Sequence, residues 1–328
     1  MECNIYDTDL NRVGVLYTWV SMVWEESYND EGSFQLELQQ IDSLTDLLQV
    51  DRYCGIPDSD TLMIIKAIEI SDGTVLASGY PATHILADRV STTVISNQPA
   101  ETALRALISS MDAWPGLELG DPAGISDTFT AQKSDATLLE YCQIISQAVD
   151  MGFRLRHDKA RKKLLFECYK PEANPNAKYS SLYGNMGEIR YSVSSANYKN
   201  VAVVAGAGEG ADRITVLAGA TDMTGFTRRE MYVDARQEQM QDGETESAYR
   251  SRLTQYGEEQ LVGQVIIEQV SCTVDAGELS LGDLVYCSLP ELGVKLQVRV
   301  TGLTMTSELN GTTWEASLGT PIVLRRRS

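Results

Sequence analysis

Histidine is scarce in this sequence, since His84 and His157 are the only two among 328 residues. A metal site or a nucleophile–histidine pair therefore has few candidates. Six cysteines lie at positions 3, 54, 142, 168, 272 and 287, and no two are spaced like a metal knuckle or a redox motif. We expect buried, reduced thiols, with Cys142 on a helix and Cys168 in a strand. The sequence predicts no catalytic, cofactor-binding or metal-binding residue, and no cofactor.

Long apolar runs are also absent, because no window approaches the roughly 20 residues that a membrane span requires. The first residues, MECNIYDTDLNRVG, lack the basic and then apolar layout of a secretory signal. We therefore expect no membrane span. We also expect a protein that is made and kept soluble in the cytoplasm until assembly or lysis.

Positive charge is in short supply: 27 Lys and Arg stand against 46 Asp and Glu, a net charge of −19. This balance argues against binding nucleic acid through its phosphates, which requires clustered Lys and Arg. The simplest role for such a charge is solubility. With 43% apolar and 22% charged residues the chain can build cores, and its length predicts two or three domains.

The clearest pattern present is that of residues 278–319, where apolar residues recur at every second position. Leu296, Val298 and Val300 alternate with polar neighbours, which is typical of strands with one buried face. Pro290 to Gly293 separates the first two runs, and Asn310-Gly311 favours a hairpin with two residues at φ > 0. A three-stranded antiparallel meander is predicted.

Residues 1 to about 95 show the same strand-like pattern of apolar residues in shorter runs. Asn29 to Gly32 and Asp72-Gly73 are turn signals between them. We predict a small antiparallel sheet, closed on itself or folded as a sandwich.

The spacing of the apolar residues changes from strand-like to helical at Asn97. Helical spacing predicts a helix from Pro99 to about Met111, then a Gly/Pro-rich loop, WPGLELGDPAGIS, and a second helix capped by Ser134 and ended by Gly152. The strands FRLR and KLLFECY follow, joined by the basic turn HDKARKK. These features indicate a compact α+β insertion.

Strand patterns resume at Gly187 and are interrupted by one helix at about Glu244 to Leu261. The basic end Arg325-Arg326-Arg327 is interpreted as frayed, with an electrostatic contact to an acidic neighbour as the alternative.

Several motifs suggest chemistry but have simpler interpretations. Gly206-Ala207-Gly208-Glu209-Gly210 follows a strand, yet the next run, RITVLAG, is again a strand, so a hairpin is favoured over a nucleotide site. In the pairs Glu25-Glu26, Glu258-Glu259 and Arg228-Arg229, the two adjacent side chains point to different sides of their element. Neither acidic pair therefore presents two carboxylates to one substrate. The basic turn Lys159 to Lys163 is expected at a hairpin tip. Four aromatic residues suggest either a sugar platform or a core or interface: Tyr17, Trp19, Trp24 and Tyr28.

The sequence resembles the siphophage tail proteins that form the baseplate or tail-tip hub, because several segments occur in the same order as in that family. These segments are YNDEGSFQLEL, GYPATHILADRV, ETALRALI, YKNVAVVAGAGEG, RREMYVDAR and LGDLVYCSLPELGVKLQVRVTGLTMT with its terminal WEASLGTP. The resemblance extends from about Glu26 to Pro321, and no catalytic signature belongs to it.

The resemblance implies a mainly β, α+β fold. Two β-barrel-like domains, at 1–96 and 187–328, would flank an inserted α+β domain at 97–186, with a helical insertion near 244–261 in the second barrel. It further implies a homotrimeric ring, similar to the hubs of contractile-tailed phages, that continues the tail tube and passes DNA and the tape-measure protein.

The expected partners are the distal tail protein ring, the C-terminus of the tape-measure protein, and tail-tip or receptor-binding proteins. Sequence-specific nucleic acid binding is not expected. The protein would be a structural virion component of the tail tip, assembled in the cytoplasm of the bacterial host. We expect its acidic residues to line the ring interior, and we expect no C-terminal extension with a cell-wall or receptor module.

Two alternatives to a structural, non-enzymatic hub stay open. A host-glycan receptor-binding module would use the aromatic N-terminal strands or the insertion. A tail-associated cell-wall hydrolase ranks lower, because it requires a nucleophile with a base, a metal site or two facing carboxylates.

Overall fold

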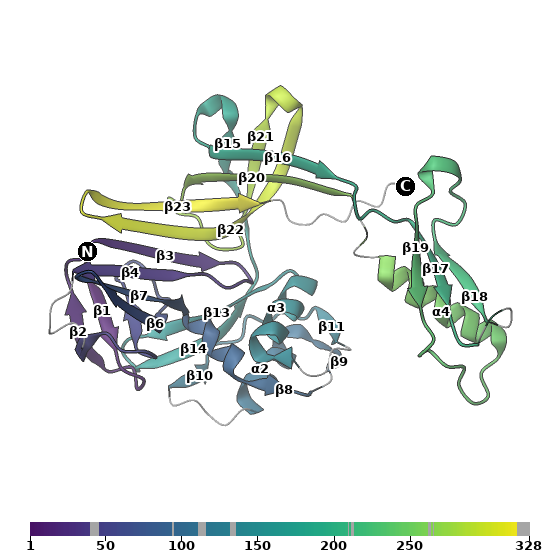
Figure 1. The fold of residues 1–328 in the computed structure, drawn as a ribbon, viewed down its shortest axis with the longest axis horizontal. Helices are drawn as coiled ribbons and strands as arrows, with labels where there is room; N and C mark the ends of the chain where they lie inside the picture. The colour runs from purple at the N-terminus through teal and green to yellow at the C-terminus, as the bar shows by residue number, and fades with distance from the viewer. Residues whose placement is uncertain are drawn as a thin grey trace. The chain divides into compact units, whose positions relative to one another are not determined.

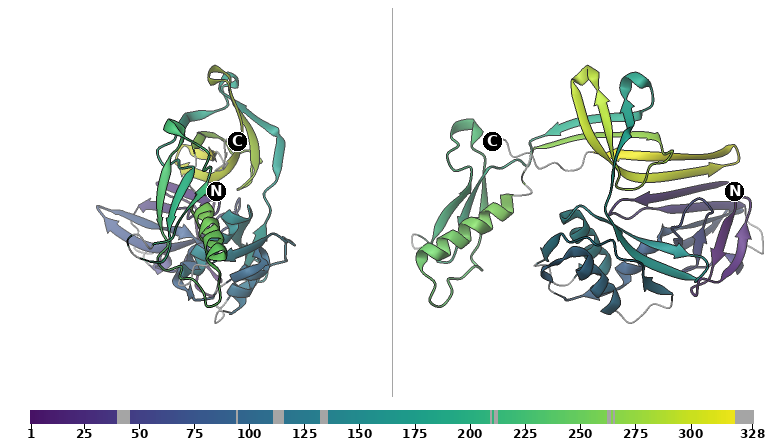
Figure 2. Two further views of the ribbon diagram at one scale, coloured as in Figure 1. Left: turned by 90° about the vertical axis from the view of Figure 1, so that its right-hand side faces the viewer. Right: turned by 180° about the vertical axis from the view of Figure 1, so that it is seen from behind.

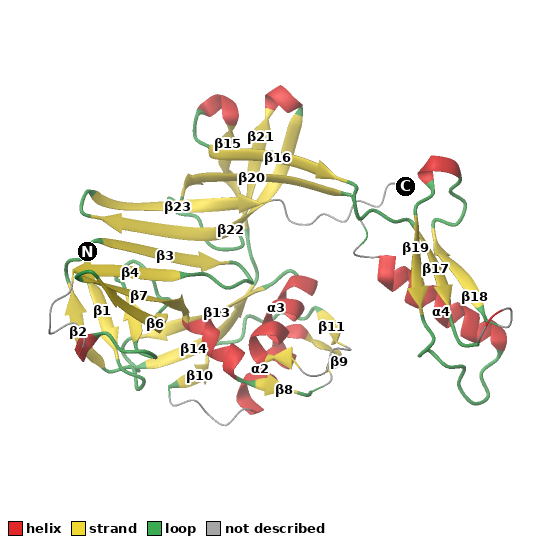
Figure 3. Cartoon of the chain, in the orientation of Figure 1, coloured by secondary structure: helices red, strands yellow, loops and turns green. Residues whose placement is uncertain are grey.

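The computed structural model describes residues 1–39, 46–93, 95–110, 116–131, 136–208, 210, 213–261, 264 and 266–319. The chain forms two compact units. Unit 1 contains Met1–Ile189 and Cys272–Gly319, and the described part of unit 2 lies within Arg190–Ser271. Strands dominate unit 1, and its helices α2 (Ala100–Ser110) and α3 (Leu138–Ala148) lie in the segment between β7 (Thr74–Pro81) and β13 (Gly152–Asp158) (Figure 3).

The N-terminal part of unit 1 is an antiparallel set of seven strands. Along the sheet they follow the order β3, β4, β7, β6, β5, β1 and β2 (Figure 1). The strands are β1 (Cys3–Tyr6), β2 (Arg12–Leu16), β3 (Ser21–Ser27), β4 (Phe34–Gln39), β5 (Tyr53–Gly55), β6 (Met63–Ser71) and β7 (Thr74–Pro81). Asp72 and Gly73, at φ 49° and 81°, form the tight turn that the sequence predicts between β6 and β7.

Both faces of this sheet are buried at the start of β6, which explains the continuous apolar run there. Met63 and Ile65 join a core with Trp24 and Phe34. Ile64, between them, joins a second core formed mainly by the helices and strands of the insertion. Because side chains alternate along a strand, one sheet separates the two cores.

The predicted α+β insertion packs on the second of these faces. Its elements are η1 (Ala82–Asp88), β8 (Val90–Ser91), β9 (Ile95–Pro99), α2 (Ala100–Ser110), β10 (Leu117–Leu119), β11 (Thr128–Ala131), β12 (Ala136–Thr137), α3 (Leu138–Ala148), β13 (Gly152–Asp158) and β14 (Lys163–Tyr169). The two predicted helices and the β13–β14 hairpin are confirmed.

Two details of the insertion differ from the sequence prediction. Ser134 lies outside the described residues, and the N-cap of α3 is Thr137, which exchanges hydrogen bonds with Glu140 in a capping box. The predicted loop after α2 contains β10, which pairs in parallel with β14. A three-residue strand inside a Gly/Pro-rich stretch leaves no periodic signal.

The predicted C-terminal meander is confirmed. β21 (Leu284–Leu289), β22 (Val294–Glu308) and β23 (Gly311–Gly319) pair antiparallel in sequence order. η5 (Pro290–Leu292) and Gly293, at φ 66°, form the first turn. The second turn is shifted by one residue: its loop is Leu309-Asn310, and only Gly311 has a positive φ, 143°.

The meander and the N-terminal strands form one sheet. Residues Gly302 to Glu308 of β22 pair antiparallel with Ser27 to Ser21 of β3, and Figure 1 and the right view of Figure 2 show the two strands side by side. β15 (Ala173–Ser180) joins the far side by pairing in parallel with β21, and a register shift between Ala173 and Lys178 spans Pro175. Neither half closes into a barrel through strand pairs in the described ranges, so the two-barrel arrangement stays a prediction.

The chain leaves unit 1 within β16 (Gly187–Ser194) and re-enters it within β20 (Ile267–Asp275). The two units group the chain differently from the three predicted domains, whose boundaries also stay a prediction.

Unit 2 is a small sheet covered by one helix. β17 (Val201–Ala205) pairs antiparallel with β18 (Thr215–Gly219) and parallel with β19 (Glu230–Asp234), while η4 (Gly225–Thr227) lies between the last two. The predicted helix is α4 (Glu246–Leu261), and its buried residues Tyr249, Leu253 and Gly257 recur every four positions. The helix approaches the sheet closely at Gly257, where a Cβ would lie 2.5 Å from Val204 Cγ2.

Candidate functional site

Two large hollows in unit 1 adjoin one another. The first has a volume of about 660 Å³ and the second about 710 Å³. Both are lined by Asp58, Leu279, Leu303 and Trp314, so they share a wall. We call the two hollows together the groove.

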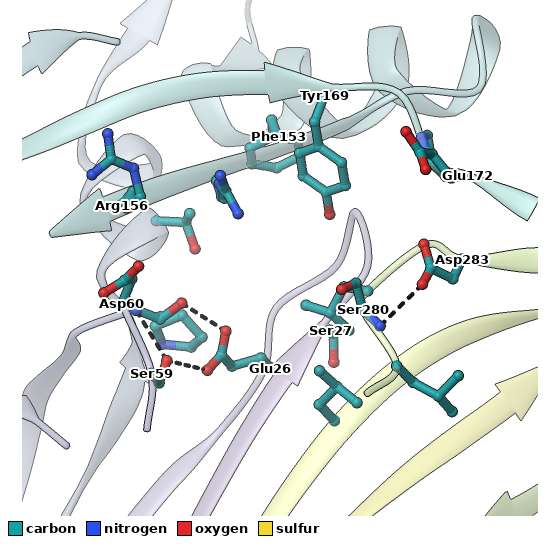
Figure 4. Close-up of a pocket in the computed structure, with 18 of the residues that line it drawn as sticks. Glu26, Ser27, Ser59, Asp60, Phe153, Arg156, Tyr169, Glu172, Ser280 and Asp283 are labelled. Atoms are coloured by element: carbon teal, nitrogen blue, oxygen red, sulfur yellow. Dashed lines mark hydrogen bonds between the residues drawn. The ribbon is translucent and has the colours of Figure 1, made fainter. Parts of the chain in front are cut away.

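Segments far apart in the sequence meet at the groove (Figure 4). Glu26 and Ser27 come from the end of β3, and Ser59 and Asp60 come from the loop before β6. Residues Phe153, Arg156 and Tyr169 lie on β13 and β14. Ser280 and Asp283 belong to the loop that leads into β21.

Glu26 holds one wall of the groove in place. Its carboxylate accepts hydrogen bonds from Ser59 Oγ at 2.7 Å, Thr61 Oγ1 at 2.6 Å and Trp24 Nε1 at 3.0 Å. Ser59 Oγ also accepts a bond from the Thr61 amide at 3.0 Å. The loop before β6 is therefore fixed to β3 by several polar contacts.

The cations of the groove are already paired. Arg154 and Arg156 contact Glu167 at 2.8 and 2.7 Å, and Lys170 contacts Asp127 at 3.0 Å. Burial alone would raise the pKa of Glu167, but hydrogen bonds from Arg156 and Arg154 hold the pKa of this carboxyl below its ordinary value.

The carboxylates of the groove have no such partners. Within the described ranges none of the eight makes an ion pair; they are Glu26, Asp30, Asp58, Asp60, Glu172, Asp275, Asp283 and Glu315. Three of them accept backbone amides in tight turns, as Asp283 does from Ser280 at 3.2 Å. Among the described residues that line the groove, carboxylates outnumber cations by eight to three, so the groove is an acidic concavity.

Next to the groove, Arg299 of β22 links three segments of unit 1. Its guanidinium donates to Gly282 O and to Asp150 Oδ1, each at 2.7 Å, and lies 5.0 Å from the centre of the Tyr28 ring. Asn29 Nδ2 donates to Met151 O at 2.7 Å. Burial raises the pKa of Tyr28 to about 12. These contacts join β3, the insertion and the loop before β21.

The aromatic residues near the N-terminus do not form one platform. Trp24 is fully buried in the core, and Tyr28 lies beside Arg299. Tyr17 is 69% exposed, and with Trp19 and Leu309 it lines a separate hollow of about 370 Å³. Trp19 Nε1 also donates to Ser307 Oγ at 3.1 Å.

The other motifs take the simpler interpretations. The glycine-rich segment begins the hairpin loop between β17 and β18, where Arg213 Nε donates to Gly206 O at 2.9 Å. Lys159 to Lys163 form the tip of the β13–β14 hairpin, where Lys163 pairs with Glu118 at 3.2 Å and Arg161 contacts the same carboxylate. Glu25 accepts from Ser33 Oγ at 2.7 Å, on the other side of β3 from Glu26.

The two histidines lie in different surroundings. His84 Nδ1 is 2.6 Å from Glu31 Oε1, and its ring stacks on Tyr80 at 4.4 Å. His157 is buried, and both ring nitrogens lack a hydrogen-bond partner. All six cysteines are buried and free, as predicted.

The described residues contain no group of three or more His, Cys, Asp or Glu arranged to hold a metal ion. The absence of catalytic and cofactor-binding residues stays a prediction. Among the helices in the described ranges, none is both long and apolar enough to cross a bilayer.

The groove, the single sheet and the insertion can be compared with known proteins. The family model described as Siphovirus ReqiPepy6 Gp37-like protein matches residues 2–320. The chain belongs to this family. No curated protein is significantly similar to it.

Solved structures of phage tail proteins share the fold of this family member. A tail protein from Neisseria meningitidis MC58 is 13% identical with a TM-score of 0.61, covering 97% of this chain and 95% of the other. The 43 kDa tail protein of prophage MuSo2 from Shewanella oneidensis is 11% identical with a TM-score of 0.60, covering 99% and 100%.

A chain of the p2 virion baseplate in its activated conformation is 9% identical with a TM-score of 0.51, covering 98% of both chains. The resemblance to phage tail proteins is confirmed. The fold is mainly β.

Proposed function

We propose that this protein is a structural subunit of a phage or prophage tail-tip or baseplate hub. Three copies form a ring that continues the tail tube, and DNA and the tape-measure protein pass through it. The observation that carries the proposal is the seven-residue pairing of β3 with β22, which places the N-terminal and C-terminal β regions in one sheet. Family membership and the fold shared with tail and baseplate proteins support it.

Two barrel-like regions in each of three copies would give the ring six similar positions, which suits a sixfold tube. The distal tail protein ring would contact one side of the hub, and tail-tip or receptor-binding proteins the other. The C-terminus of the tape-measure protein would contact its interior. In this proposal the protein is a component of the virion tail tip, is assembled in the bacterial cytoplasm, and breaks no bond.

The net charge of −19 suits a channel for DNA. Carboxylates on the inner wall would repel the polyanion over a distance of about 8 Å at physiological salt. A cryo-electron microscopy map of the assembled ring tests this point, since a neutral or basic lumen would exclude it.

Light scattering of the chain together with the distal tail protein tests the ring. We expect the hub component at three times 36.1 kDa, in a complex that survives dilution, because obligate rings bury more than about 2,000 Å² per contact. A hub that binds the distal protein as a monomer, or does not bind it, would contradict the proposal. The chain alone is a weaker test, because such subunits can assemble only with a partner.

A glycan-binding role is the second candidate, and the hollow lined by Tyr17 and Trp19 favours it over hydrolysis. A glycan array with the wild-type chain and Trp19→Ala tests it. Loss of a specific signal in the variant would support this role, and no signal with either protein would exclude it.

A further inference from the structure

The lining of the groove in unit 1 combines apolar side chains with an excess of carboxylates. Trp314, Leu279 and Leu303 lie where the two hollows meet, and Leu281, Phe153 and Tyr169 extend the apolar surface of the first hollow. The eight carboxylates outnumber the three cations of the same lining. Since the cations are already paired with Glu167 and Asp127, the excess charge is negative throughout.

This combination selects one chemical class of ligand. A nucleic acid strand would be repelled by the carboxylates. The described residues offer no metal-ligating cluster. A neutral sugar would leave the charges uncompensated, whereas a cation that also carries aliphatic groups would match both features.

The two adjoining hollows narrow the class of ligand further. In an extended peptide successive side chains point to opposite sides, so one set can contact Trp314 and the leucines while the other faces the carboxylates. Each hollow is within the usual range of about 300–1,000 Å³ for ligand sites, and two adjoining hollows accommodate a run of several residues.

We propose that the groove binds an extended segment of a partner protein in which Lys or Arg alternates with aliphatic residues. Asp58, Asp60 and Glu315 supply the charge, and Trp314 supplies the apolar contact. The inference does not depend on the hub function, because trimerisation and peptide binding are measured separately.

The probe is a fluorescein-labelled peptide of sequence Leu-Arg-Val-Lys-Leu-Arg-Val, titrated with the full chain by fluorescence anisotropy. We expect saturable binding that weakens as salt rises, because the charges are exposed to solvent. A matched peptide with Glu in place of Arg and Lys should not bind. Equal binding of the two peptides, or binding that salt does not change, would overturn the proposal.

Isosteric variants identify the site. Combining Asp58→Asn, Asp60→Asn and Glu315→Gln should weaken binding by about tenfold, the effect of removing three exposed charge contacts. The matched control combines Asp9→Asn, Glu69→Gln and Glu308→Gln, which neutralises three exposed carboxylates of unit 1 outside the groove lining. Equal affinities of the two triple variants would contradict the assignment.

Tryptophan fluorescence gives a readout that needs no loss of charge. Peptide binding should change the emission of the wild-type chain, and Trp314→Phe should keep the affinity within about threefold, since such a swap is mild, while losing most of the emission change. An unchanged response in this variant would place the peptide elsewhere.

The chain's own basic end is the competing occupant. Replacing Arg325, Arg326 and Arg327 by Ser should leave the affinity for the probe unchanged. A gain of about tenfold, the effect of removing three competing charges, would mean that this end fills the groove, and would overturn the assignment to a partner protein.

Discussion

Units 1 and 2 both bury a sheet, but with side chains of different size. The core around β3 and β4 contains large residues such as Trp24, Phe34 and Met63. In the core of unit 2 the small residues Ala202, Val204 and Ala218 of the sheet face Gly257 of one helix. In the first case stability comes mainly from the apolar area of big side chains. In the second it depends on how closely Gly257 of α4 approaches Val204 and Ala218 of the sheet. Shortening a core side chain should therefore destabilise unit 1, whereas enlarging one should destabilise unit 2.

The helix of unit 2 shows why the close approach is needed. Most of α4 is polar, and its contact face holds two large residues, Tyr249 and Leu253, before Gly257. Tyr249 Oη accepts a hydrogen bond from the Ala207 amide at 2.8 Å and donates to Glu238 O at 2.5 Å. With so little apolar area, dispersion contacts at short range carry a larger share of the stability.

The largest effect is expected for Trp24→Ala in unit 1. Trp24 is fully buried, packs edge-on against Phe34 at 5.7 Å and donates to Glu26. Its removal should cost about 3–5 kcal/mol of the free energy of unfolding of unit 1. Hydrogen exchange in increasing denaturant, followed by mass spectrometry, separates peptides of β4 from those of β17. Protection should fall in β4 and stay unchanged in β17.

Tyr17→Ala is the control, because Tyr17 is an exposed aromatic residue of the same unit and its loss should cost less than about 0.5 kcal/mol. If Trp24→Ala lowered protection equally in β4 and β17, the two units would unfold as one and the comparison would fail.

Gly257→Leu should have the next largest effect, in unit 2. A Cβ there would lie 2.5 Å from Val204 Cγ2 and 2.8 Å from Ala218 Cβ, both on the sheet. Replacing a helical glycine gains about 1 kcal/mol of helix propensity, but overpacking costs about 1–3 kcal/mol or more. We expect a net loss of about 1–2 kcal/mol, visible as lower protection in β17 only.

Glu258→Leu tests whether position or residue type is responsible. Glu258 is exposed on the same turn of α4, so its replacement should change stability by less than about 0.5 kcal/mol. A stabilised Gly257→Leu variant would show that the helix can move away from the sheet without cost.

The local parts of this fold could be predicted from the sequence, and the long-range parts could not. Alternation and the dipeptide Asp72-Gly73 reveal strands and turns because they act within a few residues. The pairing of β3 with β22 joins segments almost 300 positions apart, and nothing in either strand specifies its partner. β15 contains Pro175 and two asparagines, residues that are uncommon in strands, so the sequence does not indicate a strand there.

The groove escaped prediction for a related reason. Glu26, Asp58, Asp275 and Trp314 each look like ordinary residues of a strand or turn, and only the fold brings them together. The role of Gly257 was equally hidden, since a glycine within a helical pattern indicates weakness until the opposing sheet is known. Absence of motifs therefore says little about surfaces that bind by shape and charge.

The smallest effect is expected from the pH dependence of unit 1, through His157. Burial holds the pKa of this imidazole below its ordinary value, Lys159 acts in the same direction, and Asp60 and Asp158 oppose it. Its ring meets Tyr6 edge-on at 4.9 Å, and neither nitrogen has a partner that could hold a proton. The native state therefore favours the neutral form.

The sign of the effect follows from proton uptake. Near the ordinary pKa of about 6.5 the unfolded chain binds a proton that native His157 does not, so the stability of unit 1 falls as the pH drops below that value. The decrease in stability ends once the pH lies below the pKa of native His157. Carboxylates titrate outside this window, nearer to about pH 4. His157→Phe should remove the slope between about pH 7 and 5.5, whereas His84→Gln should keep it. Because unit 2 contains no histidine, β17 should show no slope in this window, and an equal slope in both units would remove the distinction between them.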